Sequence, residues 1–156
     1  MAEYSSNAVQ TVNPGETVIF TESPFPCKRG LVRHRDDSGS FLLSGWTPTR
    51  YSPCGCRARN AAEYLTAFGA NIAIPEGGTA GPISLALSLD GSTLPATTMI
   101  VTPAAVNEYF NVSVESSIGI WNNCCESLAV RNTSDQPILV QNANIIFSRP
   151  DLVVSY

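Results

Sequence analysis

The sequence is poor in charge, and above all in lysine. Charged residues make up 14% of its 156 residues, against about 25% in an average soluble domain, and Lys28 is its single lysine. The net charge of −4 argues against nucleic-acid binding, because that requires a positive field. Hydrophobic residues reach 44%, so much of the surface must be neutral or face another subunit.

Long apolar runs are missing too. No stretch approaches the ~18 apolar residues of a membrane-spanning helix, so we expect no membrane insertion. The opening MAEYSSNAVQ has neither the basic nor the apolar region of a secretory signal, which predicts synthesis in a cytoplasm without export. The length predicts one domain, with an N-terminal arm or first strand over 1–15 and a single domain over 16–156.

Motifs of enzymes and metal sites are absent from the sequence. The one histidine, His34, lies in His34-Arg35-Asp36, which matches only a fragment of a kinase signature. Phosphate-binding loops, dinucleotide fingerprints and nucleophile elbows do not occur, and the thirteen carboxylates are dispersed. We therefore predict no catalytic residues, no cofactor and no metal.

The five cysteines do not have the spacing of a zinc site. Two pairs occur, but neither is a C-x-x-C pair that would place two thiolates around one ion. Reduced thiols are expected in a reducing cytosol, and a disulfide between the two pairs remains open because connectivity cannot be deduced from sequence. The candidate thiol or disulfide cluster is Cys54, Cys56, Cys124 and Cys125, with Cys27 left over.

Short alternating segments separated by turn residues predict an all-β protein. Ile83–Leu89 alternates with a period of two, and Asp90-Gly91 after it suits a tight hairpin turn. We read 61–74 mainly as strand and Ser23–Pro26 as a breaker. Turn signals every 8–12 residues then predict eight to ten strands in a sandwich or barrel. Other expected strands cover 8–12, 17–21, 31–34, 40–43, 97–101, 109–114, 118–121, 127–130 and 138–147.

The positive charges are concentrated in one segment. Seven of the nine cations lie between positions 28 and 59, where only two anions occur. Such a segment is either a solvated basic loop or a docking face for an acidic protein, which arginine forks suit well. The seven are Lys28, Arg29, Arg33, Arg35, Arg50, Arg57 and Arg59, of which the first four are the main candidates for contact with a partner.

Several segments together resemble one known family. The sequence from 71 to 149 is similar to the bacterial and phage branch of the trimeric jelly rolls related to complement and tumour-necrosis-factor domains. Residues 27–36 look most like those of small tailed-phage proteins. The matching segments are Asn71–Pro75, Gly81–Leu87, Asp90-Gly91, Leu94-Pro95, Leu128–Ser134 and Asn144–Arg149.

The resemblance implies a jelly-roll β-sandwich that forms a homotrimer and has no catalytic activity. It suggests a structural protein of a phage virion surface, a decoration or cementing trimer that binds the major capsid protein or another virion protein. Val9 and Thr11 would then help to add a strand to a neighbour's exposed edge. Deletion of residues 2–12 is expected to leave a folded trimer.

Two other functions remain open. The first is a receptor- or glycan-binding knob of a phage fibre, with Trp46, Tyr51 or Trp121 as the platform for a host-surface sugar. Packing of these three side chains in the core is the reading we favour for them. The second is a protein of a spore surface.

Overall fold

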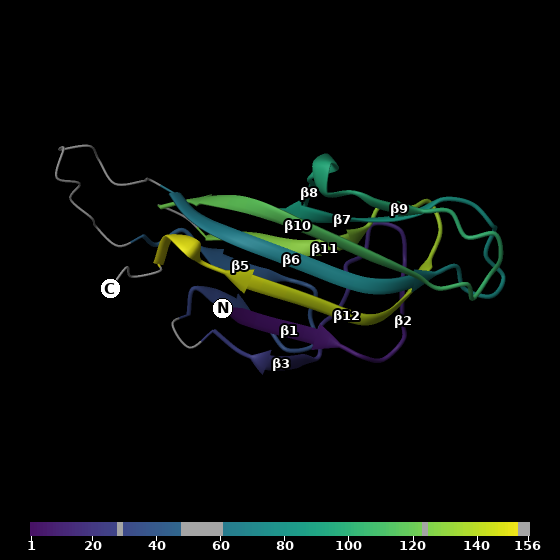
Figure 1. The fold of residues 1–156 in the computed structure, drawn as a ribbon, viewed down its shortest axis with the longest axis horizontal. Helices are drawn as coiled ribbons and strands as arrows, with labels where there is room; N and C mark the ends of the chain where they lie inside the picture. The colour runs from purple at the N-terminus through teal and green to yellow at the C-terminus, as the bar shows by residue number, and fades with distance from the viewer. Residues whose placement is uncertain (28–29, 48–60, 123–124, 153–156) are drawn as a thin grey trace.

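The structure is a computed structural model that describes residues 1–27, 30–47, 61–122 and 125–152. These residues form two six-stranded antiparallel sheets packed face to face (Figure 1). The all-β sandwich predicted from the sequence is therefore confirmed. No helix in the described part of the chain is long and apolar enough to cross a membrane.

The first sheet has the order β10-β6-β12-β1-β3, and β2 pairs with β12 beside β1. Its long strands β6, β10 and β12 alternate buried and accessible residues over most of their length, the pattern of a sheet with one face on a core. Its strands are β1 (Ala2–Ser6), β2 (Gln10–Val12), β3 (Glu22–Phe25), β6 (Ala61–Ala73), β10 (Phe110–Trp121) and β12 (Ile138–Ser148).

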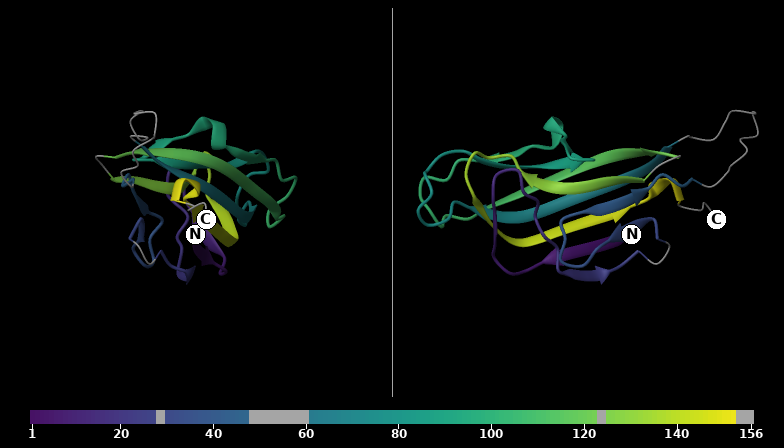
Figure 2. Two further views of the ribbon diagram at one scale, coloured as in Figure 1. Left: turned by 60° about the vertical axis from the view of Figure 1, so that its left-hand side comes forward. Right: turned by 180° about the vertical axis from the view of Figure 1, so that it is seen from behind.

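The second sheet has the order β4-β5-β11-β7-β8, and β9 pairs with β7. Two short 3-10 helices, Pro95–Thr97 and Pro150–Leu152, complete the elements of the described residues. In Figure 2 the two sheets can be followed from the side and from behind. The strands are β4 (Val32–His34), β5 (Phe41–Ser44), β7 (Ile83–Leu89), β8 (Ser92–Thr93), β9 (Met99–Val101) and β11 (Cys125–Asn132).

An aromatic cluster fills one part of the core between the sheets. The Phe41 ring, fully buried, lies 4.9 Å from the Tyr4 ring, 5.1 Å from Phe20 and 5.1 Å from Phe147, measured between centroids. The His34 ring stacks on Phe41 at 4.5 Å. These rings come from both sheets and from the 17–20 segment. The cluster therefore packs the two sheets and this segment against one another.

Several predicted strands are confirmed closely. Ile83–Leu89 is β7 with the predicted ends, and β6 covers all but the last residue of 61–74. The turn that follows β7 has positive φ at both Asp90 (46°) and Gly91 (81°), which is the backbone of a type I′ hairpin.

Other local predictions were wrong. Ser23–Pro26 was expected to be a breaker, but Glu22–Phe25 is β3, an edge strand where proline is tolerated. The segment 17–21 makes only isolated bridges. Expected strands at 109–114 and 118–121 are one strand, β10. The short strands β1, β3 and β8 were not expected, and the described residues contain twelve strands rather than eight to ten.

The first residues of the chain belong to the body of the sandwich. β1 pairs with β12 on one side and β3 on the other, and Tyr4 is only 3% exposed. Because β1 lies inside its sheet, we now expect deletion of residues 2–12 to disrupt the fold. The predicted division at residues 15 and 16 stays a prediction.

One buried hydroxyl gives a stability prediction. Thr66 is fully buried on β6, and its Oγ1 has no hydrogen-bond partner among the described residues. Thr66→Val should therefore raise the free energy of unfolding by about 1 kcal/mol and the Tm by roughly 2–4 °C. Thermal and urea unfolding measure both quantities.

Thr97→Val is the matched control. The Thr97 hydroxyl is buried too, but it donates to Leu94 O at 2.7 Å and accepts from Leu87 N at 2.9 Å. Loss of these bonds should lower the free energy of unfolding by about 1–3 kcal/mol. Equal destabilisation by the two substitutions would contradict the assignment of Thr66 as unsatisfied.

Candidate interaction surface

The three long strands of the first sheet present mostly small and uncharged side chains on their outward side. Alternation along β6, β10 and β12 turns every second residue away from the core. We call these residues the low-charge face; it carries two carboxylates and no cation. Its members are Ala61, Glu63, Leu65, Ala67, Gly69, Asn71, Asn111, Ser113, Glu115, Ser117, Gly119, Trp121, Leu139, Gln141, Asn144, Ile146 and Ser148.

The strand registers place these residues in rows across the sheet. Asn144 and Ser113 flank Gly69, and Ser148 and Ser117 flank Leu65. A third row runs from Ile146 through Ala67 to Glu115. Of the two carboxylates, Glu63 accepts a hydrogen bond from Ser117 Oγ at 2.9 Å, and Glu115 lies on the edge strand β10.

Two glycines on this face have no conformational reason to be glycine. Gly69 and Gly119 do not have positive φ. A Cβ at Gly119 would meet nothing within 4 Å, and one at Gly69 would make only ordinary contacts, at 3.8 Å and 4.0 Å. Glycine weakens a strand and often marks a place where another backbone approaches closely. The two glycines therefore leave open space above the low-charge face.

The predicted partner-contact arginines lie elsewhere. Arg33 is exposed on β4, the edge strand of the second sheet, and Arg35 is exposed just after it. The turn residues Asp36 and Asp37 follow directly and are exposed as well. Lys28 and Arg29 lie outside the described residues, as do Arg50, Arg57 and Arg59. Contact of this segment with a partner stays a prediction.

Val9 and Thr11 lie at the start of the chain and are both exposed. Thr11 belongs to β2, which already pairs with β12. Gln10 ties this strand to the next segment, because its Nε2 donates to Ile19 O at 2.9 Å and its Oε1 accepts from Ile19 N at 2.8 Å. Strand addition from this segment to a neighbour stays a prediction.

The cysteines are only partly described. Cys125 is exposed at the start of β11 and is a free thiol, whereas Cys27 is half-buried after β3. The other three members of the predicted cluster (Cys54, Cys56 and Cys124) lie outside the described residues. Among the described residues, no group of three or more His, Cys, Asp or Glu side chains could hold a metal ion.

The His34 side chain is held in place by contacts within the fold. Its Nε2 lies 3.0 Å from Phe20 O and its Nδ1 lies 3.2 Å from Ser40 O, while its ring stacks on Phe41. Both ring nitrogens are thus directed at backbone carbonyl groups. The side chain links β4 to β5 and to the 17–20 segment.

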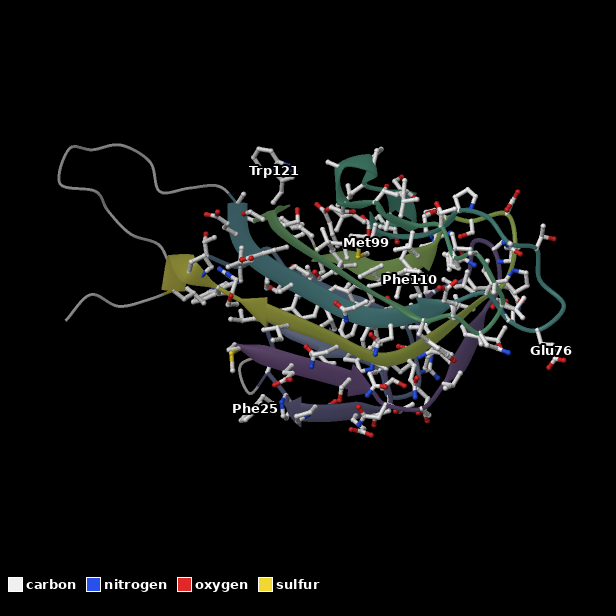
Figure 3. The ribbon with its side chains drawn as sticks, turned by 45° about the vertical axis from the view of Figure 1, so that its right-hand side comes forward. Phe25, Glu76, Met99, Phe110 and Trp121 are labelled. Carbon is white, nitrogen blue, oxygen red and sulfur yellow. The ribbon has the colours of Figure 1, made fainter. Side chains whose placement is uncertain are left out.

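The tryptophans do not pack in the core. Trp46 is 52% exposed and Trp121 is 64% exposed, so the core packing favoured from the sequence was wrong for both. Figure 3 shows Trp121 projecting from the end of β10, away from the sandwich. Tyr51 lies outside the described residues.

Comparisons with known proteins identify the fold. No family model matches the chain, and no curated protein matches it. A tumour-necrosis-factor protein, Eiger of S. frugiperda, superposes over 99% of this chain and 93% of its own, with a TM-score of 0.65 and 11% identity. The globular domain of zebrafish complement 1qA protein superposes over 93% and 94%, with a TM-score of 0.58 and 10% identity.

The chain has the jelly-roll fold of these domains. The jelly roll expected from the sequence is thereby confirmed, while the phage branch and the homotrimer stay predictions. The C-terminal domain of EclA, a sugar-binding protein, also aligns, with 14% identity over 90% of this chain and 79% of its own. Its TM-score of 0.39 is too low to bear on this jelly roll.

The low-charge face was not singled out from the sequence. Two features of the sequence could have indicated it. One glycine lies within the alternating segment Phe68–Ile74, and a second lies within the expected strand Ile118–Trp121. Only the strand register brings Gly69 beside Ser113 and Gly119 beside Glu63, so the common face becomes visible in the folded chain.

Proposed function

We propose that this jelly roll is a non-enzymatic structural protein that assembles as a homotrimer and decorates the capsid of a bacteriophage. Three copies would pack through their low-charge faces. A trimer seated across capsid subunits would act by adhesion, since the extra buried area opposes separation of the shell proteins. The outward-facing residues of β6, β10 and β12 carry the proposal.

The low-charge face supports self-association for three reasons. Charged residues are depleted in the cores of protein interfaces, and this face carries only two carboxylates beside the apolar side chains of Leu65 and Ile146. Side chains such as Ala67 and Ser113 leave room for close packing, and the strand glycines Gly69 and Gly119 leave more. A closed symmetric oligomer buries the same patch on every copy and leaves none of it in solvent.

The placement of the exposed arginines is compatible with docking. Arg33 and Arg35 belong to the β4 edge of the second sheet, so packing through the first sheet would leave them accessible. Guanidinium groups form strong bonds with carboxylates, which a capsid exterior could supply.

Gly69→Arg tests the proposed interface. A Cβ at position 69 meets only ordinary contacts, so the variant should fold. Its long charged side chain should keep neighbouring low-charge faces apart, and multi-angle light scattering at micromolar concentration should report about one chain instead of three. Thr93→Arg, on the exposed strand β8 of the other sheet, is the matched control and should remain trimeric.

Each outcome decides one part of the proposal. A wild-type monomer at micromolar concentration would rule out the homotrimer, and a trimeric Gly69→Arg variant would rule out this face as its interface. Co-sedimentation of the wild-type trimer with purified phage capsids tests the decoration role. If the trimer does not co-sediment with capsids, the decoration role is ruled out and a structural role on another surface is what remains.

Glycan binding is the second candidate, and the exposed tryptophans favour it. Aromatic rings open to solvent can stack on sugars, and Trp46 and Trp121 are both more than half exposed. Glycan-array binding by the wild type that Trp121→Ala abolishes would favour the fibre knob over the decoration protein.

A further inference from the structure

A cavity opens at the end of the sandwich where β1 starts and β12 ends. Its volume is about 630 Å³, within the ~300–1,000 Å³ of small-molecule sites. Buried side chains of Ala2, Val32 and Phe147 form part of its lining. Pro24, Phe25 and Pro26 contribute a further wall. Most of the surface inside is therefore apolar.

One charged side chain lines the described part of the cavity. Among the described residues that line it, only Arg149 has a charged side chain. The Arg149 guanidinium lies over the Tyr64 ring, with its carbon 4.8 Å from the ring centroid. Nη1 donates to Tyr64 Oη at 3.3 Å and Nη2 donates to Trp46 O at 3.0 Å. These contacts hold the cation in place beside the apolar walls.

Tyr64 adds a neutral polar group beside this cation. Its hydroxyl oxygen lies 2.9 Å from Leu31 O and 2.7 Å from Ser44 O, so the two carbonyl groups share its one hydrogen. Burial raises the pKa of Tyr64 above its ordinary value, although Arg149 acts in the opposite direction. The hydroxyl therefore stays protonated at neutral pH and adds no charge beside the guanidinium.

We propose that this cavity binds a medium-chain monocarboxylic acid, with the alkyl chain against the apolar walls and the carboxylate at Arg149. A guanidinium forms charge-assisted hydrogen bonds with a carboxylate. A sugar would leave its hydroxyl groups facing apolar walls, which is costly. This ligand site goes beyond the proposed function and is independent of the oligomeric state.

Calorimetric titration of the wild type with hexanoate, octanoate and decanoate tests whether the apolar walls bind the alkyl chain. Affinity should rise about fifteen-fold from octanoate to decanoate, because each buried CH₂ contributes about 0.8 kcal/mol. Decanol is the uncharged comparison and should bind at least tenfold more weakly than decanoate. Failure of decanoate to saturate the folded protein at submicellar concentration would overturn the proposal.

Three substitutions test the contribution of the charge and that of the apolar walls separately. Arg149→Gln should weaken decanoate binding about 10- to 100-fold, the effect of a lost hydrogen bond to a charged group, and leave decanol binding unchanged. Arg149→Lys keeps the charge and should recover part of the affinity. Phe25→Ser should weaken both ligands about equally; Phe25 is 57% exposed and projects beside β3 (Figure 3), so its loss should not affect folding.

Ile100→Ser is the matched control for Phe25→Ser, because it also replaces an exposed apolar side chain with serine. Ile100 is 64% exposed and is not among the residues that line the cavity, so its removal should leave both affinities unchanged. Circular dichroism checks that every variant is folded. Equal decanoate affinity in the wild type, Arg149→Gln and Phe25→Ser would place binding elsewhere and overturn the site.

The thiols provide a second readout within one sample. Cys27 lines the cavity, whereas Cys125 is exposed and is not among its lining residues. In reduced protein, saturating decanoate should slow alkylation of Cys27 at least fivefold and leave the rate at Cys125 unchanged, as measured by peptide mapping. Equal rates at Cys27 with and without decanoate would contradict occupancy of the cavity.

Discussion

A variant that lacks residues 2–12 is expected not to fold. The deletion removes β1, which lies between β12 and β3, and also β2. It takes Tyr4 out of the aromatic cluster and uncovers the β12 residues opposite β1, including Ile145 and Phe147. The loss of an interior strand with its ladder far exceeds the marginal stability of about 5–15 kcal/mol of a domain this size.

Circular dichroism and urea unfolding of the purified variant check this expectation. Glu3→Gln serves as the control, because it keeps the strand and leaves an oxygen that can accept the bond from Asn144 Nδ2. The control should unfold cooperatively, like the wild type. A cooperative unfolding transition in the deletion variant would mean that the remaining strands close the sandwich without β1.

Phe41→Ala should lower the free energy of unfolding by about 3–5 kcal/mol. Phe41 is fully buried, and its ring is surrounded by Tyr4, Phe20, His34 and Phe147. Truncation leaves a cavity bounded by side chains from both sheets, so the walls cannot collapse from one side alone. Urea unfolding, analysed by linear extrapolation, measures the loss.

Phe25→Ala is the matched control because it removes the same ring from a site that is 57% exposed. Its effect on the free energy of unfolding should stay within about 0.5 kcal/mol. Similar losses at positions 25 and 41 would mean that the aromatic cluster contributes no more to stability than an exposed ring.

The second half of the fold was largely predictable because its signals are local. β7 alternates over its whole length, and Asp90-Gly91 has the residue types that a type I′ turn requires. β12 also lies almost where its apolar residues predicted. In these segments side-chain period and turn chemistry favour the same structure, so no distant contact is needed to decide between alternatives.

The missed strands depend on distant partners. β1 has little alternation in its sequence, yet pairing with β12 and β3 makes it a strand. β3 contains Pro24 and lies at the sheet edge, where a missing N–H group costs little. Glu115, Ser116 and Ser117 interrupt the apolar pattern of β10, but continuous pairing with β6 carries the strand through them.

The surfaces were less predictable than the fold. The low charge of the sequence pointed correctly to neutral surface, but only the register of β10, β6 and β12 shows where it gathers. The cavity could not be predicted, because Phe25, Tyr64 and Arg149 meet only after both ends of the chain have folded together. Such sites depend on contacts between residues far apart in sequence.

The pairing of β1 with β12 also has a consequence for biosynthesis. Ala2 lies opposite Phe147, so the first strand has no partner on that side until residue 147 has been translated. At about 5–20 residues per second, β1 waits roughly 7–28 s for β12. A chain dominated by such long-range pairings folds slowly, and the sandwich cannot close before β12 has been made. In the meantime the unpaired strand edges are open to aggregation, which makes chaperone supply a determinant of yield.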